Sequence, residues 1–152
     1  MAQIFTVTAN DTLTLSGHVF VDLADGDETI LTFPNNLVTR KTGKNGNTLF
    51  AQNAPGQNCD LTLRLMRGSP DDVYMQGLIN TVPTDFPSTV LLAGTFVKRL
   101  GDGQGYVVSD TYTLAGGIIS KIPEGKENVD GDTSQAVAVY NVIFASGARS
   151  LQ

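Results

Sequence analysis

The chain has 152 residues, of which 41% are hydrophobic and 16% charged, and its formal net charge at pH 7 is −5. This length suits a single domain with its own core, and the acidic balance excludes a nucleic-acid binder that works through a basic surface. The single cysteine, Cys59, rules out an internal disulfide. No Lys or Arg precedes Arg40 and no apolar run approaches the ~18 residues that span a bilayer, so neither a signal peptide nor a membrane anchor is predicted.

The N-terminal third is predicted to form short β-strands. Residues 18–23 show the clearest pattern, because His18, Phe20 and Asp22 alternate with Val or Leu and so place two kinds of side chain on opposite faces. Turn-forming residues, such as the D-G-D sequence at 25–27, separate the segments. The predicted strands of this third are 4–8, 12–15, 18–23, 29–33 and 37–42.

The segment 43–58 differs in character, because Gly, Asn and Gln dominate it and its apolar content is low. A loop longer than ~12 residues is unusual in a compact domain and is often functional. Arg40, Lys41 and Lys44 make the approach to this loop the most basic part of an acidic chain. A solvated hairpin would explain the segment, but we favour an extended arm at about 41–58 that contacts another subunit.

A helix start at Ser69 is the strongest local signal in the sequence. Alternating leucines at 61–65 predict a strand that delivers the chain to this point. Ser69 is a good N-cap, and Pro70 suits the first helical position. The helix dipole is sufficient to explain Asp71 and Asp72, which follow directly.

Apolar residues then recur with helical spacing, at i, i+3, i+4 and i+7. The members of this stripe are Met75, Leu78, Ile79 and Val82. Pro83 ends the pattern, so we predict a single amphipathic helix at about 69–82 that packs against a β-structure.

Strands and turns also dominate the C-terminal half, where the predicted strands are 88–100, 106–114, 118–122 and 135–144. Gly116-Gly117 is predicted to turn the chain, and 146–152 is predicted to be a polar tail ordered only by a neighbour. Together these elements predict one mainly β domain spanning 1–152. We expect two packed antiparallel sheets, or a partly open β-barrel, with one flanking α-helix.

Groups that could support catalysis are scarce. His18 is the only histidine, and no serine or cysteine lies in a nucleophile motif such as G-x-S-x-G. The acidic stretch 128–132 lacks the ligand spacing and the closing glutamate of a calcium loop, and Asp-Gly pairs between strands are first of all turns. We therefore predict that the chain is not an enzyme and holds neither a cofactor nor a metal ion.

Four features follow one another along the chain: a strand-rich N-terminal third, a long arm at 40–58, a strand at 61–67 that leads into a helix, and a strand-rich C-terminal half. The sequences IFTVTANDTL at 4–13 and KTGKNGNT at 41–48 add to this pattern. In these respects the chain resembles the tail tube proteins of tailed bacteriophages, the contractile kind especially. Those proteins are in turn similar to the haemolysin-coregulated tubes of type VI secretion.

The resemblance implies sixfold rings that stack into a hollow tube through which DNA leaves the capsid. The implied partners are other copies of the chain in homohexameric rings, together with sheath, baseplate and tail terminator proteins. The implied location is the tail of a virion that is assembled in the host cytoplasm. Acidic charge on the lumen would repel phosphates and keep the passing DNA from adhering.

The arm would then make contacts between rings, and an outward strand face would line the lumen. The candidate inter-ring residues are Arg40, Lys41, Lys44, Asn45 and Asn47. The candidate lumen residues are His18, Asp22, Thr111 and Thr113. The alternative is a stand-alone β-sandwich module that binds a sugar or protein ligand, which the absence of Trp and the presence of only four Tyr weaken.

Overall fold

The computed structural model describes residues 3–8, 12–24, 26, 28–53, 57–127 and 129–152. Parts of the predicted turns at 9–11 and 25–27, part of the predicted arm at 54–56, and Asn128 lie outside these described residues. The strands are β1 (Thr6–Val7), β2 (Thr12–Leu15), β3 (His18–Val19), β4 (Thr29–Thr32), β5 (Val38–Thr42), β6 (Thr48–Gln52), β7 (Cys59–Met66), β8 (Leu92–Gly101), β9 (Val107–Ile119) and β10 (Val137–Leu151). The helices are α1 (Pro70–Asn80) and the short 3₁₀ helices η1 (Phe86–Ser88) and η2 (Thr133–Ala136).

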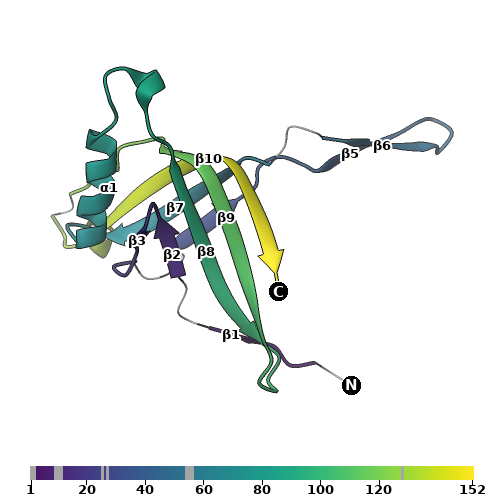
Figure 1. The fold of residues 1–152 in the computed structure, drawn as a ribbon, viewed down its shortest axis with the longest axis horizontal. Helices are drawn as coiled ribbons and strands as arrows, with labels where there is room; N and C mark the ends of the chain where they lie inside the picture. Colours follow the sequence, from purple (N-terminus) through teal and green to yellow (C-terminus); the bar gives the residue numbers. More distant parts are fainter. Residues whose placement is uncertain (1–2, 9–11, 25, 27, 54–56, 128) are drawn as a thin grey trace.

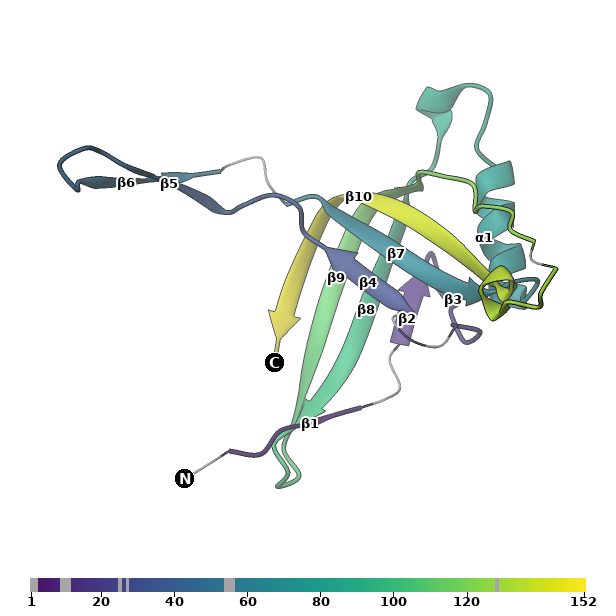
Figure 2. The same ribbon diagram turned by 180° about the vertical axis from the view of Figure 1, so that it is seen from behind.

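Eight strands form one antiparallel sheet in the order β3-β2-β8-β9-β10-β7-β4, and β1 pairs with β8 beside this path. Figures 1 and 2 show the sheet curving around its core, with α1 at one end and β1 at the other. The described part of the sheet does not close, since its terminal strands β3 and β4 pair with β2 and β7 only. The second sheet is the hairpin of β5 and β6, which projects away from the body (Figure 1).

The predicted mainly β fold, with two antiparallel sheets, no closed barrel and one α-helix among the described residues, is confirmed. The small sheet is the arm, however, so the core is enclosed by the curvature of the large sheet. A sheet that curves upon itself buries one face without needing a second sheet against it.

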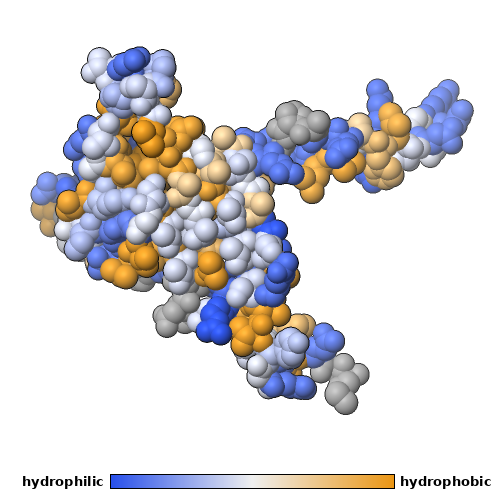
Figure 3. All heavy atoms as spheres, in the orientation of Figure 1, coloured by the Kyte–Doolittle hydropathy of each residue, from blue (hydrophilic) through white to orange (hydrophobic). Residues whose placement is uncertain are grey.

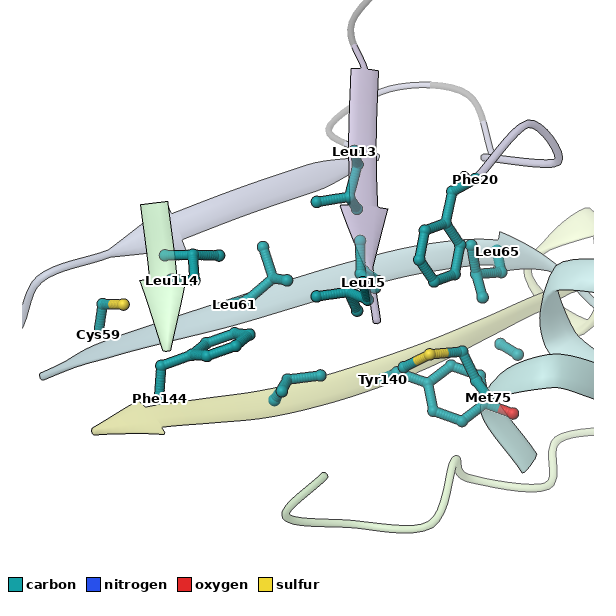
Figure 4. Packing of buried hydrophobic residues seen from close by; sticks show 13 residues of the cluster. Leu13, Leu15, Phe20, Cys59, Leu61, Leu65, Met75, Leu114, Tyr140 and Phe144 are labelled. Atoms are coloured by element: carbon teal, nitrogen blue, oxygen red, sulfur yellow. The ribbon is translucent and has the colours of Figure 1, made fainter. Parts of the chain in front are cut away.

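The core is formed by the inward rows of β2, β7 and β10. Leu13 and Leu15 of β2 point toward β7, as Figure 4 shows. Alternation along β7 is strict: Cys59 and the three leucines 61, 63 and 65 are buried, while the residues between them face outward. The β10 register places Tyr140 opposite Leu63, so both inward rows pack in one layer. The predicted two-faced strand is confirmed here.

Helix α1 begins as predicted. The Ser69 side chain accepts a hydrogen bond from the Asp72 amide at 3.3 Å, and the Asp72 carboxylate accepts one from the Gly68 amide at 2.8 Å. This reciprocal cap satisfies two amides that would otherwise lack partners at the helix start. The helix ends at Asn80 with Thr81 as its C-cap, two residues earlier than predicted.

The predicted apolar stripe is only partly correct. Met75 is fully buried, and Leu78 and Ile79 are partly buried against the core. Val82 lies beyond the helix and is 40% exposed, so it is not a member of the buried face. Pro83 disfavours the α conformation at Val82 and has no amide hydrogen to donate, which accounts for a helix that does not reach Val82.

The predicted turn at Gly116-Gly117 is wrong, because β9 runs through both residues to Ile119. Gly116 has φ +70, a left-handed conformation that bends the strand without reversing it. A side chain on Gly117 would clash with the ring of Phe144, which packs across the strand at this position. Of the predicted strand 118–122, residues 118 and 119 are the end of β9 and residues 120–122 are not in a strand, while the glycine pair permits curvature.

The predicted polar tail at 146–152 is also wrong. β10 extends to Leu151 and pairs with β9 along this whole stretch, for example Ala148 with Thr113. The end of the strand is fixed by two backbone hydrogen bonds between Ser109 and Gln152. Small polar residues are compatible with a strand whose faces are not packed in the core.

Candidate assembly surfaces

The arm is a regular two-stranded hairpin that stands clear of the body. β5 pairs with β6 in a register that includes Arg40 opposite Phe50 and Lys41 opposite Leu49, and every residue of both strands is exposed. The arm starts three residues before the predicted range of about 41–58, because Val38 is already paired with Gln52. An isolated two-stranded hairpin is marginally stable in water, so this arm is the kind of element that a partner completes.

The five predicted inter-ring residues all lie in this arm. Arg40 and Lys41 are neighbours on β5 and therefore point to opposite faces. Lys44, Asn45 and Asn47 form the tip, where the Gly43 amide donates to the Asn47 carbonyl at 2.8 Å. The tip is thus a defined turn that presents one cation and two amides at the farthest point of the hairpin (Figure 1).

A second candidate surface is the end of the large sheet opposite to α1. β7 pairs with β10 only as far as Phe144, and β9 alone pairs with β10 from Ala148 onward. At this end the sheet consists of β1, β8, β9 and the last part of β10, which we call the four-stranded section. Figure 1 shows these strands side by side, with β1 at one margin and the end of β10 at the other.

Both margins of the four-stranded section are open within the described part of the chain. Ser109 and Gln152 bond each other, so the alternate residues Arg149 and Leu151 direct their backbone groups away from β9. The Gly147 amide still donates to the Gln57 carbonyl, and no described strand pairs with β10 beyond it. β1 likewise pairs only with β8. Exposed strand edges of this kind are templates for pairing with another chain.

An ion pair stiffens one of these margins. The Arg149 guanidinium donates to both carboxylate oxygens of Asp110, at 2.8 and 2.9 Å, and lies 5.7 Å from the ring centre of Tyr112. The hydrogen bonds from Arg149 hold the pKa of Asp110 below its usual range, although burial opposes the shift. A bidentate pair across neighbouring strands fixes β10 in register with β9 up to its end.

Thr111 and Thr113, two of the predicted lumen residues, lie on the face of this sheet that points away from the core. Thr113 is opposite Thr95 and Ala148, and Thr111 is opposite Val97 and Ser150. We call this surface the hydroxyl face. Its hydroxyl-bearing members on β1, β2, β8, β9 and β10 are Thr6, Thr12, Thr14, Thr95, Ser109, Thr111, Thr113 and Ser150.

The hydroxyl face carries little charge. Arg99 is exposed on it, and its neighbour Lys98 lies on the opposite face, across from Asp110. None of the described residues that alternate onto this face of β2, β8, β9 and β10 is acidic. The expectation of an acidic lumen therefore finds no support at Thr111 and Thr113.

The structure does not bring the other two predicted lumen residues, His18 and Asp22, to this face. His18 is the first residue of β3 and faces α1, where its ring stacks on Tyr74 with 4.0 Å between ring centres. Its Nε2 is 2.7 Å from Oδ1 of Asp71. The backbone amides of Val21 and Asp22 donate to Oδ2 of the same carboxylate, both at 2.7 Å.

Asp71 therefore does more than favour the helix dipole, and the interpretation of it as a simple helix-start residue is wrong. Its side chain is 1% exposed and ties the segment 18–22 to α1. Burial by itself raises the pKa of this carboxyl, but hydrogen bonds from the Asp22 amide, His18 and the Val21 amide outweigh burial and lower it. No sequence pattern signals this contact, because its partners are about 50 residues apart.

The second aspartate of the helix start also reaches the core. The hydroxyl of Tyr140 donates to Oδ1 of Asp72 at 2.5 Å, while Oδ2 of the same carboxylate caps the helix at Gly68. Burial and then the adjacent Asp72 carboxylate raise the pKa of Tyr140. Both aspartates thus position α1 on the sheet, and neither faces outward as a free acid.

Large apolar side chains are exposed on several parts of the surface, and three of these parts are visible as orange areas in Figure 3. One is the arm, one is β1 with Phe5 and Val7, and one is the region between α1 and β8. The third area surrounds a hollow of about 310 Å³ lined by apolar residues such as Leu78, Val90 and Ile119. Contiguous exposed apolar surface of this kind marks interaction sites.

Two further features bear on function. Within the described ranges, no group of three or more His, Cys, Asp or Glu side chains is arranged to hold a metal ion. No helix among the described residues has the length and apolar character that crossing a membrane requires.

Comparison with solved structures identifies the fold. The chain is similar to a tube terminator and to a tube cap. The first is the PVC sheath/tube terminator of an extracellular contractile injection system in its extended state, at a TM-score of 0.58 and 10% identity over 95% of this chain and 94% of that one. The second is the tube-terminating cap of the anti-feeding prophage, at a TM-score of 0.58 and 14% identity over 100% of this chain and 94% of that one.

The similarity covers nearly the full length of both chains, so the fold of the whole domain is shared. At this level of identity the likeness concerns the fold alone. No protein-family model and no curated protein sequence matches the chain.

Proposed function

We propose that this chain is a non-enzymatic structural subunit that closes into a ring on the axis of a contractile, tail-like tube. Its fold is that of a tube terminator and a tube-terminating cap, so we place the ring at an end of the tube, where it would contact tube and sheath subunits. Six copies per ring is the number that the resemblance to tail tube proteins implies. In a phage, the lumen of this ring would lie on the path of the DNA.

The open margins of the four-stranded section are the observation that carries the proposal. Three successive antiparallel pairings make β1 and β10 run in opposite directions. The β10 edge of one copy can therefore accept the β1 edge of the next copy in an antiparallel ladder. Such a contact joins two different surfaces, and repetition around an axis closes into a ring. Closure would also pair the exposed β1 and β10 edges of every copy.

Side chains at the two margins fit this joint. Val7 lies opposite Leu100 on β8, and Leu151 lies opposite Asp110 on β9, which places both on the inward-facing side of the section. Val7 is 61% exposed and Leu151 is 53% exposed in the single chain. Joining the margins would bring these apolar side chains together and withdraw them from water.

Cross-linking tests the ring directly. Cys59 is fully buried, and burial raises the pKa of its thiol, so introduced cysteines can be modified selectively. In a variant with both Val7→Cys and Leu151→Cys, we expect a short bismaleimide to give a ladder of oligomers that ends at a closed ring. Each single variant is the matched control and should give no ladder. Dimers alone from either single variant, or a strictly monomeric wild-type protein, would contradict the ring.

Electron microscopy distinguishes the end of a tube from its repeating unit. We expect purified wild-type protein to form separate rings or short stacks. Long regular tubes would show that the chain is the repeating subunit and that the terminal placement is wrong, while the ring would remain.

A further inference from the structure

The arm differs from an ordinary docking hairpin because both of its faces are amphipathic. The register of β5 and β6 places Val38, Arg40 and Phe50 on one face, which we call face A. It places Lys41 and Leu49 on the opposite face, which we call face B. Each face thus combines one cation with at least one large apolar side chain.

The two faces are equally open to solvent. Phe50 on face A and Leu49 on face B are each 68% exposed. Face A also carries Val38, which is 51% exposed. Leu37 points to the same side as Lys41, since the two are four residues apart, and adds a 68% exposed side chain beside face B. A strand pair that lies on a single surface keeps one apolar and one polar face. The arm has no polar face, so covering one side alone would leave large apolar residues in water.

The charge of the arm points to its partner. Residues 37–53 contain three cations, Arg40, Lys41 and Lys44, and no acidic residue. The whole chain carries −5, so the residues outside the arm carry −8, which is −5 minus +3. The body of another copy is therefore complementary to the arm in charge. It also exposes apolar residues of its own, such as Phe86 and Val90 near α1.

The arm cannot satisfy these requirements within its own chain. Figures 1 and 2 show it extending away from the body, on the side opposite to α1. Two hydrogen bonds continue the hairpin ladder at the base of the arm. The Asn53 backbone amide donates to the Leu37 carbonyl at 2.9 Å, and the Asn53 side chain donates to the Asn36 carbonyl at 2.9 Å. Any surface that covers faces A and B is therefore supplied by other molecules.

We propose that the arm inserts between two other copies of this chain, so that face A and face B are buried against different subunits. The inference rests on the ring proposed above and specifies how its copies are held. An arm that is clasped on both sides links three subunits at once. Loss of either face would then weaken the assembly, because each face is half of the same joint.

Two adjacent residues of equal exposure allow a matched test. The test compares Phe50→Ser, which changes face A, with Leu49→Ser, which changes face B. Gln104→Ser is the control, because Gln104 is exposed in the turn between β8 and β9 and lies outside both faces of the arm. The measurement is the protein concentration at which half of the chains are assembled, by mass photometry and sedimentation velocity. Since each substitution removes a large buried apolar contact, we expect a rise of ~10-fold or more for each of the two variants.

The control should assemble like the wild type, and all three variants should melt like the wild-type monomer, because the residues are exposed there. A loss of assembly with only one of the two variants would show that the arm lies on a single surface, and would overturn the two-sided contact. Unchanged assembly with both variants would show that the arm is not an interface. The cysteine ladder through Val7 and Leu151 reports ring closure separately, so failure of the ring and failure of the two-sided arm give different results.

Discussion

Asp71 shows how one buried carboxylate can join segments that are far apart in the sequence. It accepts hydrogen bonds from two backbone amides and from His18 while its side chain is 1% exposed. A buried charge is tolerated only where donors replace the lost water, and here three donors do so. The carboxylate thereby fixes the segment after β3 against the first turn of α1.

Asp71→Asn should reduce the stability of the fold. An amide group in this site removes the charge and turns one acceptor into a donor that faces other donors, so we expect a loss of ~1–3 kcal/mol in the free energy of unfolding at pH 7. Denaturation with urea measures it. Asp60→Asn is the control, because Asp60 is exposed on the outer face of β7 and should tolerate the change.

The same residue predicts a pH dependence. The pKa of Asp71 is lower in the folded chain than its ordinary value, so the unfolded state binds the proton more readily. Its contribution is therefore complete above the unfolded pKa of ~4 and is lost as the pH falls through the lower folded value. As the pH falls from about 5 to about 2, the range in which this carboxylate takes up its proton, we expect the Asp71→Asn variant to lose less stability than the wild type. Parallel acid profiles would show that Asp71 is not a source of acid sensitivity.

At the scale of elements, burial along α1 decreases from Met75 toward the C-terminal end of the helix. The helix packs on the sheet through Met75, whereas Val82 lies past the C-cap and remains 40% exposed. Leu78 lies between these extremes, since it is partly buried and also lines the apolar hollow. The contribution of each stripe position should therefore fall along the helix.

Substitution of Met75 by Ala should cost ~2–5 kcal/mol, because the site is fully enclosed and cannot collapse easily. Val82→Ala, the matched position outside the helix, should change stability by ~0.5 kcal/mol or less. Thermal and chemical denaturation of both variants checks the difference. Equal losses would mean that the stripe extends through Val82 after all.

The elements also show what sequence patterns can and cannot predict. The start at Ser69 and the alternation of 59–66 are encoded locally, by capping chemistry and by a period of two, and both were predicted. The passage of β9 through Gly116-Gly117 involves Phe144, a residue distant in the sequence, so the local pattern of two glycines predicts a turn that does not form. β10 reaches Leu151 because β9 is there to pair with it.

The assembly surfaces were predicted in outline only. The basic, glycine-rich segment indicated an arm, and the five candidate residues all lie in it. Its division into two faces needs the register of β5 with β6, which no local pattern gives. The lumen candidates were divided by the fold, because His18 and Asp22 lie beside α1 while Thr111 and Thr113 lie on the hydroxyl face.

At the scale of the whole molecule, the body and the arm should be separable. The arm makes no hydrophobic contact with the core among the described residues, since all residues of β5 and β6 are exposed. Replacing residues 38–52 with a short Gly-Ser linker should therefore leave the melting temperature of the monomer within a few degrees of the wild type. The same variant should lose stable assembly in electron micrographs. Normal assemblies from it would remove the arm from the interface.

The hydroxyl face bears on what the proposed ring could conduct. If this face turns inward, the wall of the conduit is a hydrated layer of threonine and serine in which Arg99 is the charged residue that the described strands contribute. A polymer moving along such a wall meets short-lived hydrogen bonds over most of it, and the ring of Arg99 side chains is where its charge would be felt. The acidity of the chain then belongs to its exterior, where it governs how subunits meet, and a cationic ring of Arg99 is the charged contact that a cargo would pass.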